Sequence, residues 1–276
     1  MSDLLRVACL QLNSGNDLPA NVATVRSLAR EAAGNGAQFV LTPEYAFMLD
    51  GRGRVMRDGA LPADGGEVLA EMRELARELQ VWLLLGSLTV RTEEERIANR
   101  SVLVAADGAI IASYDKIHMF DVTLPDGKVI RESSTYLPGD RAVIADTPWG
   151  KLGLTVCYDL RFPALFRALA RAGAGFISVP SSFQRQTGKA HWHPLLRARA
   201  IENECFILAP AMCGDHPGDR QTYGHSLIVD PWGEILADGG EAPGIVYGEI
   251  DPARVAKVRR MMPSLEHDRE FLPPAP

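Results

Sequence analysis

The chain has 276 residues, of which 46% are hydrophobic and 23% are charged, as in an ordinary folded globular protein. Its net charge of −6 gives no electrostatic basis for binding nucleic acid or an anionic membrane surface. No apolar run approaches the ~20 residues of a membrane span, and the first residues lack the pattern of a secretion signal. Four cysteines are too few for a disulfide scaffold, so we expect a cytoplasmic enzyme.

Strand and helix patterns alternate along the first half of the chain. The predicted elements are strands at residues 5–12, 38–42, 81–86, 100–105 and 109–114, and helices at residues 21–33 and 66–79. Asp17 can cap the first helix, and the Asp107-Gly108 pair between two apolar runs predicts a hairpin. Apolar residues crowd together in the strands at residues 5–12 and 38–42, which is typical of a sheet that is covered on both faces.

An irregular segment at residues 117–141 precedes the second half. Long segments without a clear period usually serve as lids or binding loops. The strand and helix pattern then resumes, with strands at residues 151–156, 176–180, 206–211, 226–230 and 245–250, and helices at residues 163–172 and 191–204. We therefore expect one α/β domain built on two packed sheets, with a C-terminal tail from about residue 252.

Cys157 occupies a different position from the other three cysteines. Cys9 and Cys205 fall in predicted buried strands and Cys213 starts a loop, as expected of small apolar residues. Cys157 ends a strand and precedes a turn into a helix, at the sheet edge where α/β proteins bind ligands. Backbone N–H groups at such an elbow can lower the pKa of a thiol and stabilise an oxyanion. On position alone, a structural role for Cys157 explains the sequence equally well.

A nucleophilic thiol needs a base and a group that stabilises charge. Glu44 directly follows a predicted strand, and burial there would raise its pKa toward the working range of a base. Lys116 follows another strand and can remain positively charged beside a carboxylate and a thiolate. Each residue taken singly reads as a solvated charge in a loop, but three such groups at three strand ends indicate a catalytic site.

The histidines offer no clear alternative base or metal site. His191 and His193 are two positions apart and would point to different faces of a helix. We therefore expect no metal site and no cofactor.

Three segments resemble the signature segments of the nitrilase superfamily of carbon-nitrogen hydrolases. They are Thr-Pro-Glu-Tyr at residues 42–45, Tyr-Asp-Lys-Ile-His at residues 114–118, and Leu-Thr-Val-Cys-Tyr-Asp-Leu-Arg-Phe-Pro at residues 154–163, within a likeness that runs from Val7 to Met262. The resemblance implies a catalytic triad of Glu44, Lys116 and Cys157, with Glu132 as a fourth member. It also implies a four-layer αββα sandwich forming a single domain over residues 1–276, which pairs as a homodimer or a higher oligomer.

Further motifs look like those of the amidase branch of this superfamily. They are Thr-Gly-Lys-Ala-His-Trp at residues 187–192, Leu-Arg-Ala-Arg-Ala-Ile-Glu at residues 196–202, Tyr-Gly-His-Ser at residues 223–226 and Val-Asp-Pro-Trp-Gly at residues 229–233. The resemblance implies hydrolysis of a small carboxylate-bearing amide through a thioester, with deaminated glutathione or a related 2-oxo-acid ω-amide as substrate. A nitrilase or an N-carbamoyl hydrolase on the same triad, and a non-catalytic binding module, are the alternatives.

A carboxylate-bearing substrate of this kind requires a basic partner in the protein. Arg161, Lys189 and Arg199 are the candidates, although Arg199 can instead pair with Glu202 and Arg161 with Asp159. The candidates for the wall of the pocket are Tyr158, Ser182 and Phe183, at neighbouring strand ends.

The chain departs from the family pattern at three places. Ala164 and His193 stand where relatives usually carry Glu, and Tyr45 follows the catalytic glutamate where Ala or Cys is typical. These departures leave the triad intact and concern the identity of the substrate.

Overall fold

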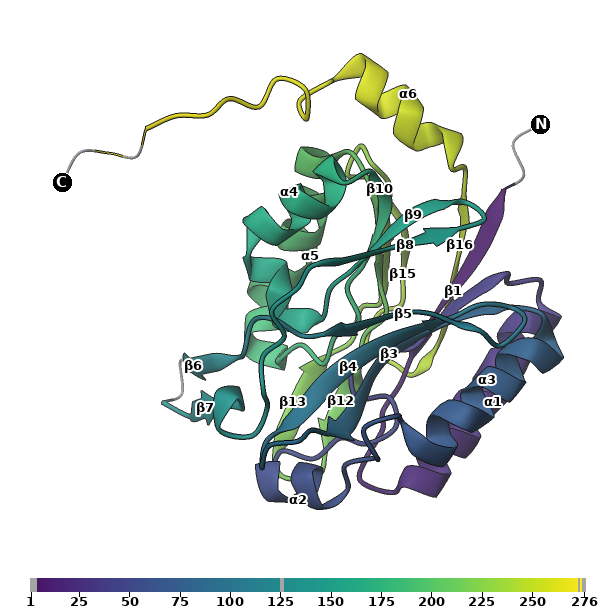
Figure 1. The fold of residues 1–276 in the computed structure, drawn as a ribbon, viewed down its shortest axis with the longest axis vertical. Coiled ribbons are helices and arrows are strands. Elements are labelled where there is room, and N and C mark those ends of the chain that lie inside the picture. The colour runs from purple at the N-terminus through teal and green to yellow at the C-terminus, as the bar shows by residue number, and fades with distance from the viewer. Residues whose placement is uncertain (1–3, 125–126, 273, 275–276) are drawn as a thin grey trace.

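Two six-stranded sheets pack face to face in the computed structural model, and helices cover the outer face of each sheet (Figure 1). The layers therefore follow the order helix, sheet, sheet, helix, which confirms the predicted αββα sandwich. The structure describes residues 4–124, 127–272 and 274. Residues 125–126 of the predicted irregular segment, and residues 273, 275 and 276 of the predicted tail, lie outside the described residues.

Four helices form the two outer layers. Helices α1 (Leu18–Gly34) and α3 (Gly66–Leu79) cover the first sheet, and α4 (Pro163–Arg171) and α5 (Arg185–Asn203) cover the second (Figure 1). Two further helices, α2 (Gly53–Asp58) and α6 (Ala253–Met261), lie at the periphery. Asp17 caps α1 as predicted, because its side chain accepts a hydrogen bond from the amide of Ala20. No helix in the described part of the chain has the length and apolar character to cross a membrane.

The first sheet has a parallel centre and antiparallel edges. In spatial order its strands are β16 (Gly244–Ile250), β1 (Leu5–Gln11), β2 (Phe39–Leu41), β3 (Trp82–Arg91), β4 (Ile97–Val104) and β5 (Ile110–Asp115). Strands β1, β2 and β3 are parallel, whereas β4 is antiparallel to both β3 and β5. Strand β5 therefore runs in the same direction as β2, so the carboxyl ends of both strands lie at one edge of the sheet.

The second sheet repeats this plan. In spatial order its strands are β15 (Ile235–Asp238), β14 (Leu227–Val229), β11 (Phe206–Ala209), β10 (Ala174–Ser178), β9 (Gly150–Leu154) and β8 (Val143–Thr147). Strands β9, β10 and β11 are parallel, and the outer strands are antiparallel to their neighbours.

Successive residues of β1 serve two separate hydrophobic cores. Val7 and Cys9 belong to the core between the sheets, whereas Ala8 and Leu10 belong to the core beneath α1 and α3. Side chains on a strand alternate between its faces, so a strand between two buried layers is apolar at most positions. This requirement explains the apolar run from Val7 to Leu10 in the sequence.

Several short elements differ from the prediction. The segment predicted to be irregular contains the hairpin of β6 (Asp121–Thr123) and β7 (Val129–Arg131), followed by the 3-10 turn η1 (Glu132–Ser134). A second hairpin, formed by β12 (Cys213–His216) and β13 (Arg220–Tyr223), was also not predicted, nor were α2, α6, β8 and β15. These elements are short, and their polar residues leave no clear apolar period.

Helix α5 begins at Arg185, six positions before the predicted start at residue 191. Gly188 lies within the additional turn and has poor intrinsic helix propensity, which explains the late prediction. A Cβ atom at this position would overlap the side chain of Tyr223 on β13. The glycine therefore allows α5 to pack closely against the β12–β13 hairpin.

Candidate active site

A cavity of about 280 Å³ lies where β2, β5 and β9 end. Its chemically functional wall residues are Glu44, Lys116, Glu132, Cys157 and Arg220. Glu44 follows β2, Lys116 follows β5 and Cys157 follows β9, so both sheets contribute to one site. The structure thus brings together the four residues predicted to be catalytic.

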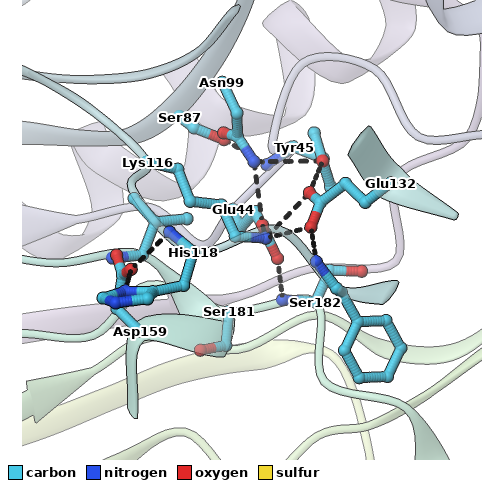
Figure 2. A network of polar contacts seen from close by, with 12 residues as sticks. Glu44, Tyr45, Ser87, Asn99, Lys116, His118, Glu132, Asp159, Ser181 and Ser182 are labelled. Atoms are coloured by element: carbon cyan, nitrogen blue, oxygen red, sulfur yellow. Dashed lines mark hydrogen bonds and ion pairs between the residues drawn. The ribbon is translucent and has the colours of Figure 1, made fainter. Parts of the chain in front are cut away.

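The ammonium of Lys116 lies between two carboxylates (Figure 2). Its Nζ is 3.0 Å from Oε1 of Glu44, and 2.8 and 2.9 Å from the two carboxylate oxygens of Glu132. Glu44 and Lys116 are only 1% and 2% exposed. Charges buried to this extent require close partners of opposite sign, which each of these groups has.

Glu44 is held by neutral donors as well. Its Oε1 accepts a hydrogen bond from Asn99 Nδ2 at 2.9 Å, and its Oε2 accepts one from the amide of Ser182 at 2.8 Å. Burial raises the pKa of Glu44, but the nearby charges of Lys116 and Arg220 and the hydrogen bonds outweigh it, so that pKa is lowered overall. The predicted rise in the pKa of Glu44 is therefore wrong in direction, and Glu44 is ionised at neutral pH.

This lowered pKa sets the expected acid limb of activity. Because the pKa of Glu44 lies below its ordinary value of 4.5, we expect the acid limb of kcat/KM to have its midpoint below pH 4.5. The free energy of unfolding should also decrease at low pH. A carboxyl group whose pKa is lowered in the folded state loses its stabilising contribution as pH falls through that pKa. A pH profile taken with brief exposures, alongside circular dichroism, measures both effects. An acid limb centred above pH 4.5 while the protein remains folded would contradict the assigned charge state.

Cys157 sits at a tight elbow between β9 and the 3-10 turn η2 (Cys157–Arg161). Its φ of +50° is a left-handed conformation that residues other than glycine seldom adopt, and its amide donates to the carbonyl of Pro180 at 3.0 Å. The thiol shares the cavity with Glu44 and Lys116 and is 7% exposed. Burial, followed by the charge of Glu44, raises the pKa of Cys157, and Lys116 only partly offsets this. The expected lowering of the thiol pKa is therefore wrong, and the resting sulfur is protonated.

Asp159 links the elbow to the segment that carries Lys116. One of its oxygens accepts hydrogen bonds from the amide of Val156 at 2.8 Å and the hydroxyl of Tyr114 at 2.7 Å. The other accepts from the amide of His118 and lies 2.7 Å from Nδ1 of the same residue (Figure 2). A single buried carboxylate therefore fixes the nucleophile and the cation relative to one another.

The structure separates the six residues predicted to contact substrate into two groups. Tyr158, Ser182 and Phe183 line the cavity. The basic residues Arg161 and Lys189 are not among the described residues that line it. The guanidinium of Arg161 stands 5.9 and 5.3 Å from the ring centroids of Tyr158 and Phe183, and Lys189 is exposed on α5.

Arg199 is the third basic candidate, and it too is absent from the described cavity wall. It is buried, donates to the carbonyl of Leu160 at 3.0 Å and pairs with Glu202 at 2.9 Å. Arg199 therefore pairs with Glu202, which was the alternative to substrate contact that the sequence spacing suggested.

The cavity wall bears three basic residues that were not predicted to contact substrate, Lys128, Arg131 and Arg220, and Arg220 is the one bonded to Ser182. Its guanidinium donates to the carbonyl oxygen of Ser182 at 2.7 Å and to the hydroxyl of the same residue. It reaches the site from β13, in the hairpin that was not predicted. An Arg beside the turn residues Pro217 and Gly218 was the only sequence signal.

Tyr45 and Asn99 complete the polar network and were also not assigned a role. The hydroxyl of Tyr45 donates to Glu132 at 3.0 Å and accepts from Asn99 Nδ2 at 3.0 Å (Figure 2). The sequence did indicate that Tyr45 is unusual, because it departs from the family motif. It gave no such indication for Asn99, which is a polar residue within a strand.

Comparison with known proteins adds to this geometry. A sequence model described as carbon-nitrogen hydrolase matches residues 6–260. The chain belongs to the carbon-nitrogen hydrolase family. One relative of this hydrolase is the deaminated glutathione amidase of Yersinia enterocolitica, which is 44% identical over 267 residues, 95% of this chain and 92% of that protein.

Solved structures of the family show the same fold. The NitFhit protein of C. elegans matches this hydrolase with a TM-score of 0.91 and 37% identity, over 96% of this chain and 65% of that one. A variant amidase from Nesterenkonia sp. AN1 matches with a TM-score of 0.78 and 27% identity, over 93% of this chain and 94% of that one. That amidase carries the acetamide moiety of fluoroacetamide added covalently at its active-site cysteine.

Proposed function

We propose that this hydrolase cleaves the terminal amide of a small carboxylate-bearing compound, deaminated glutathione or a related 2-oxo-acid ω-amide, and releases ammonia. The observation that carries the proposal is the meeting of Glu44, Lys116 and Cys157 in one cavity whose wall also bears Arg220. The deaminated glutathione amidase relative supports the substrate class. The modified cysteine of the Nesterenkonia amidase supports a covalent route through Cys157.

In the first step, the sulfur of Cys157 attacks the amide carbonyl carbon and the thiol proton passes to Glu44. Because the thiol pKa is raised and that of Glu44 is lowered, this transfer takes place as the carbon–sulfur bond forms. Lys116 and the amide of Tyr158 stabilise the oxyanion that develops on the carbonyl oxygen. One donor of this type contributes about 3–4 kcal/mol to the transition state.

In the second step, Glu44 returns the proton to the departing nitrogen, and ammonia leaves a thioester on Cys157. Water then attacks the thioester carbonyl while Glu44 accepts its proton, which yields the free carboxylic acid and restores the thiol. Glu132 holds Lys116 in place through two short contacts and is itself held by Tyr45. These steps apply equally to any primary amide. The selection of one substrate must therefore come from other residues of the cavity.

Charge explains why a basic residue is needed for recognition. Glu44 and Glu132 carry two negative charges against the single positive charge of Lys116, so this part of the site repels an anion. Arg220 offsets that excess and offers a planar guanidinium for a substrate carboxylate. Lys128 and Arg131 also line the cavity and add positive charge to its wall.

Ammonia release across a matched panel tests the substrate class. The panel contains deaminated glutathione, a 2-oxo-acid ω-amide, its uncharged ester, a nitrile and an N-carbamoyl compound. We expect the two carboxylate-bearing amides to react fastest. We also expect Arg220→Met to raise KM for them by ~10–100-fold, the loss of one charge-assisted hydrogen bond, and to leave the uncharged ester little changed.

Arg185→Gln is the matched control, because Arg185 is a surface residue that pairs with Asp215 near the same hairpin. The control should behave as the unaltered enzyme does. Faster turnover of the nitrile or the N-carbamoyl compound would replace the amidase assignment with one of its rivals. Equal losses on charged and uncharged amides would remove Arg220 from substrate recognition.

Location and assembly complete the proposal. All four cysteines are unpaired and buried, which suits the reducing environment of the cytoplasm.

Ile201 and Trp232 are about half exposed, and Gly233, next to the tryptophan, lies against Ile201. An apolar surface of this kind supports a homodimer or a higher oligomer.

A further inference from the structure

A second cluster of potential ligand side chains lies apart from the catalytic cavity. His193 of α5, His225 in the turn after β13, and Asp238 at the end of β15 meet there. Nε2 of His193 is 3.1 Å from one carboxylate oxygen of Asp238, and Nδ1 of His225 is 2.8 Å from the other. The three ligand atoms all lie within 4.8 Å of one another. None of the three residues belongs to the described wall of the catalytic cavity.

The backbone and the neighbours hold this cluster in place. His225 has a φ of +55°, its amide donates to Gly240 at 2.6 Å, and its carbonyl accepts from the indole of Trp192 at 2.7 Å. The ring of Tyr223 stacks on the imidazole of His225, with centroids 4.4 Å apart. A left-handed backbone conformation is unfavourable for histidine. These contacts stabilise that conformation and so fix the direction of the imidazole.

Asp238 is fixed independently of the two imidazoles. Its Oδ1 also accepts a hydrogen bond from the amide of Gly240 at 2.9 Å. Each carboxylate oxygen thus accepts a contact from one imidazole, and the additional bond from Gly240 holds the carboxylate between the two rings.

We propose that His193, His225 and Asp238 bind one divalent transition-metal ion, for which Zn²⁺ is the best match. Two imidazole nitrogens and one carboxylate oxygen suit Zn²⁺, whereas Mg²⁺ and Ca²⁺ prefer sites made of oxygen ligands. The side chains are 27%, 19% and 35% exposed in that order, so water has access to complete a tetrahedral shell.

Binding requires only a small change in the protonation of the two rings. In the metal-free cluster, a neutral imidazole that donates to Asp238 carries its N–H on the nitrogen that faces the carboxylate. When the ion binds, that nitrogen supplies its lone pair and the proton moves to the other ring nitrogen. No oxidant, reductant or covalent step is involved.

The expected role of the ion is structural. It would link α5 to the turn at His225 and to the end of β15, which lie 32 and 45 positions further along the chain than His193. Trp192 packs on Phe183 with ring centroids 5.0 Å apart, and Phe183 lines the catalytic cavity. The ion would therefore stiffen the layer directly behind one wall of the active site.

This proposal departs from the expectation of no metal site. That expectation considered His191 and His193, and the structure indeed separates them, since His191 contacts Arg161 instead. The true partners of His193 lie 32 and 45 positions further along the chain (225 − 193 and 238 − 193). His193 is also one of the positions at which the chain departs from the family motif.

The test uses the untagged full-length chain, both unaltered and with Cys157→Ala to remove the catalytic thiol as a competing ligand. Titration with ZnCl₂ alone in a calorimeter should show one ion bound per chain and a higher melting temperature. His193→Gln and Asp238→Asn should each weaken binding by at least ~100-fold, since even second-shell losses cost 10–100-fold. His191→Gln, an exposed histidine on the same helix, is the control and should bind as the parent does.

A second measurement keeps the test decisive if a variant folds poorly. Pulsed electron paramagnetic resonance of the parent chain loaded with one Cu²⁺ counts the coordinated imidazoles, and two are expected. Fewer than two imidazoles, no saturable uptake of Zn²⁺, or equal affinity in well-folded His193→Gln would each overturn the proposal.

Discussion

Replacing Cys157 by alanine is expected to abolish ammonia release, with a loss in kcat of at least ~10⁴-fold, while the protein stays folded. The sulfur is the atom that forms the proposed thioester, and neither Glu44 nor Lys116 can replace it as a nucleophile. The substitution only shortens a small buried side chain, so its effect on stability should be modest. Ammonia release and the melting temperature of the purified variant are the two measurements.

Cys205→Ala provides the matched control for this experiment. Cys205 is fully buried immediately before β11, and it lies outside the described wall of the cavity. We expect the control to retain activity. A substrate-derived mass on the peptide that contains Cys157, trapped by rapid acid quench, would reveal the thioester directly. Turnover by Cys157→Ala protein free of host amidases would rule out the proposed mechanism.

Replacing Lys116 by methionine is expected to remove both activity and a large part of the stability. Without the ammonium, the buried carboxylate of Glu44 and the partly buried carboxylate of Glu132 lose the cation that lies between them. Loss of one partner from a buried ion pair costs about 3–5 kcal/mol, because the remaining charge is uncompensated. Urea denaturation at pH 7 measures this loss in the free energy of unfolding.

The pH dependence of this variant gives a sharper signature. Two facing carboxylates raise each other's pKa, so the folded variant binds a proton more readily than the unfolded chain does. Its stability should therefore increase as pH falls from 7, opposite to the trend expected from Glu44 in the unaltered enzyme.

The double variant Lys116→Met with Glu132→Gln tests whether repulsion between the carboxylates of Glu44 and Glu132 causes the loss of stability. Removing one carboxylate should recover part of the lost stability without restoring turnover. A single variant as stable as the parent, or a double variant no more stable than the single one, would contradict the electrostatic account of this site.

The sandwich and the meeting of Glu44, Lys116 and Cys157 in one cavity were accessible from the sequence for the same physical reason. Strands buried on both faces produce largely apolar runs, and polar residues at the ends of those runs stand out against them. Glu44, Lys116 and Cys157 each stand at or just past such an end, and the family likeness fixed their relation to one another.

Contacts between distant segments explain what the sequence did not reveal. Arg220 reaches the cavity because a short hairpin folds over the site, and that hairpin has too few residues to show a strand period. The pKa directions of Glu44 and Cys157 depend on burial and on nearby charges that act in opposite directions, so predicting them requires the distances between those charges. Asn99 and Tyr45 gain significance only through hydrogen bonds across 54 and 87 positions of the chain.

The protonated state of Cys157 has a consequence for the durability of the catalyst. Peroxides and alkylating agents react with the thiolate form of cysteine, and they do so more rapidly when the sulfur is exposed. Burial and the adjacent carboxylate suppress that form until a substrate carbonyl is in place to receive the sulfur. The resting enzyme should therefore tolerate oxidative stress that would inactivate a hydrolase whose cysteine is stored as an anion.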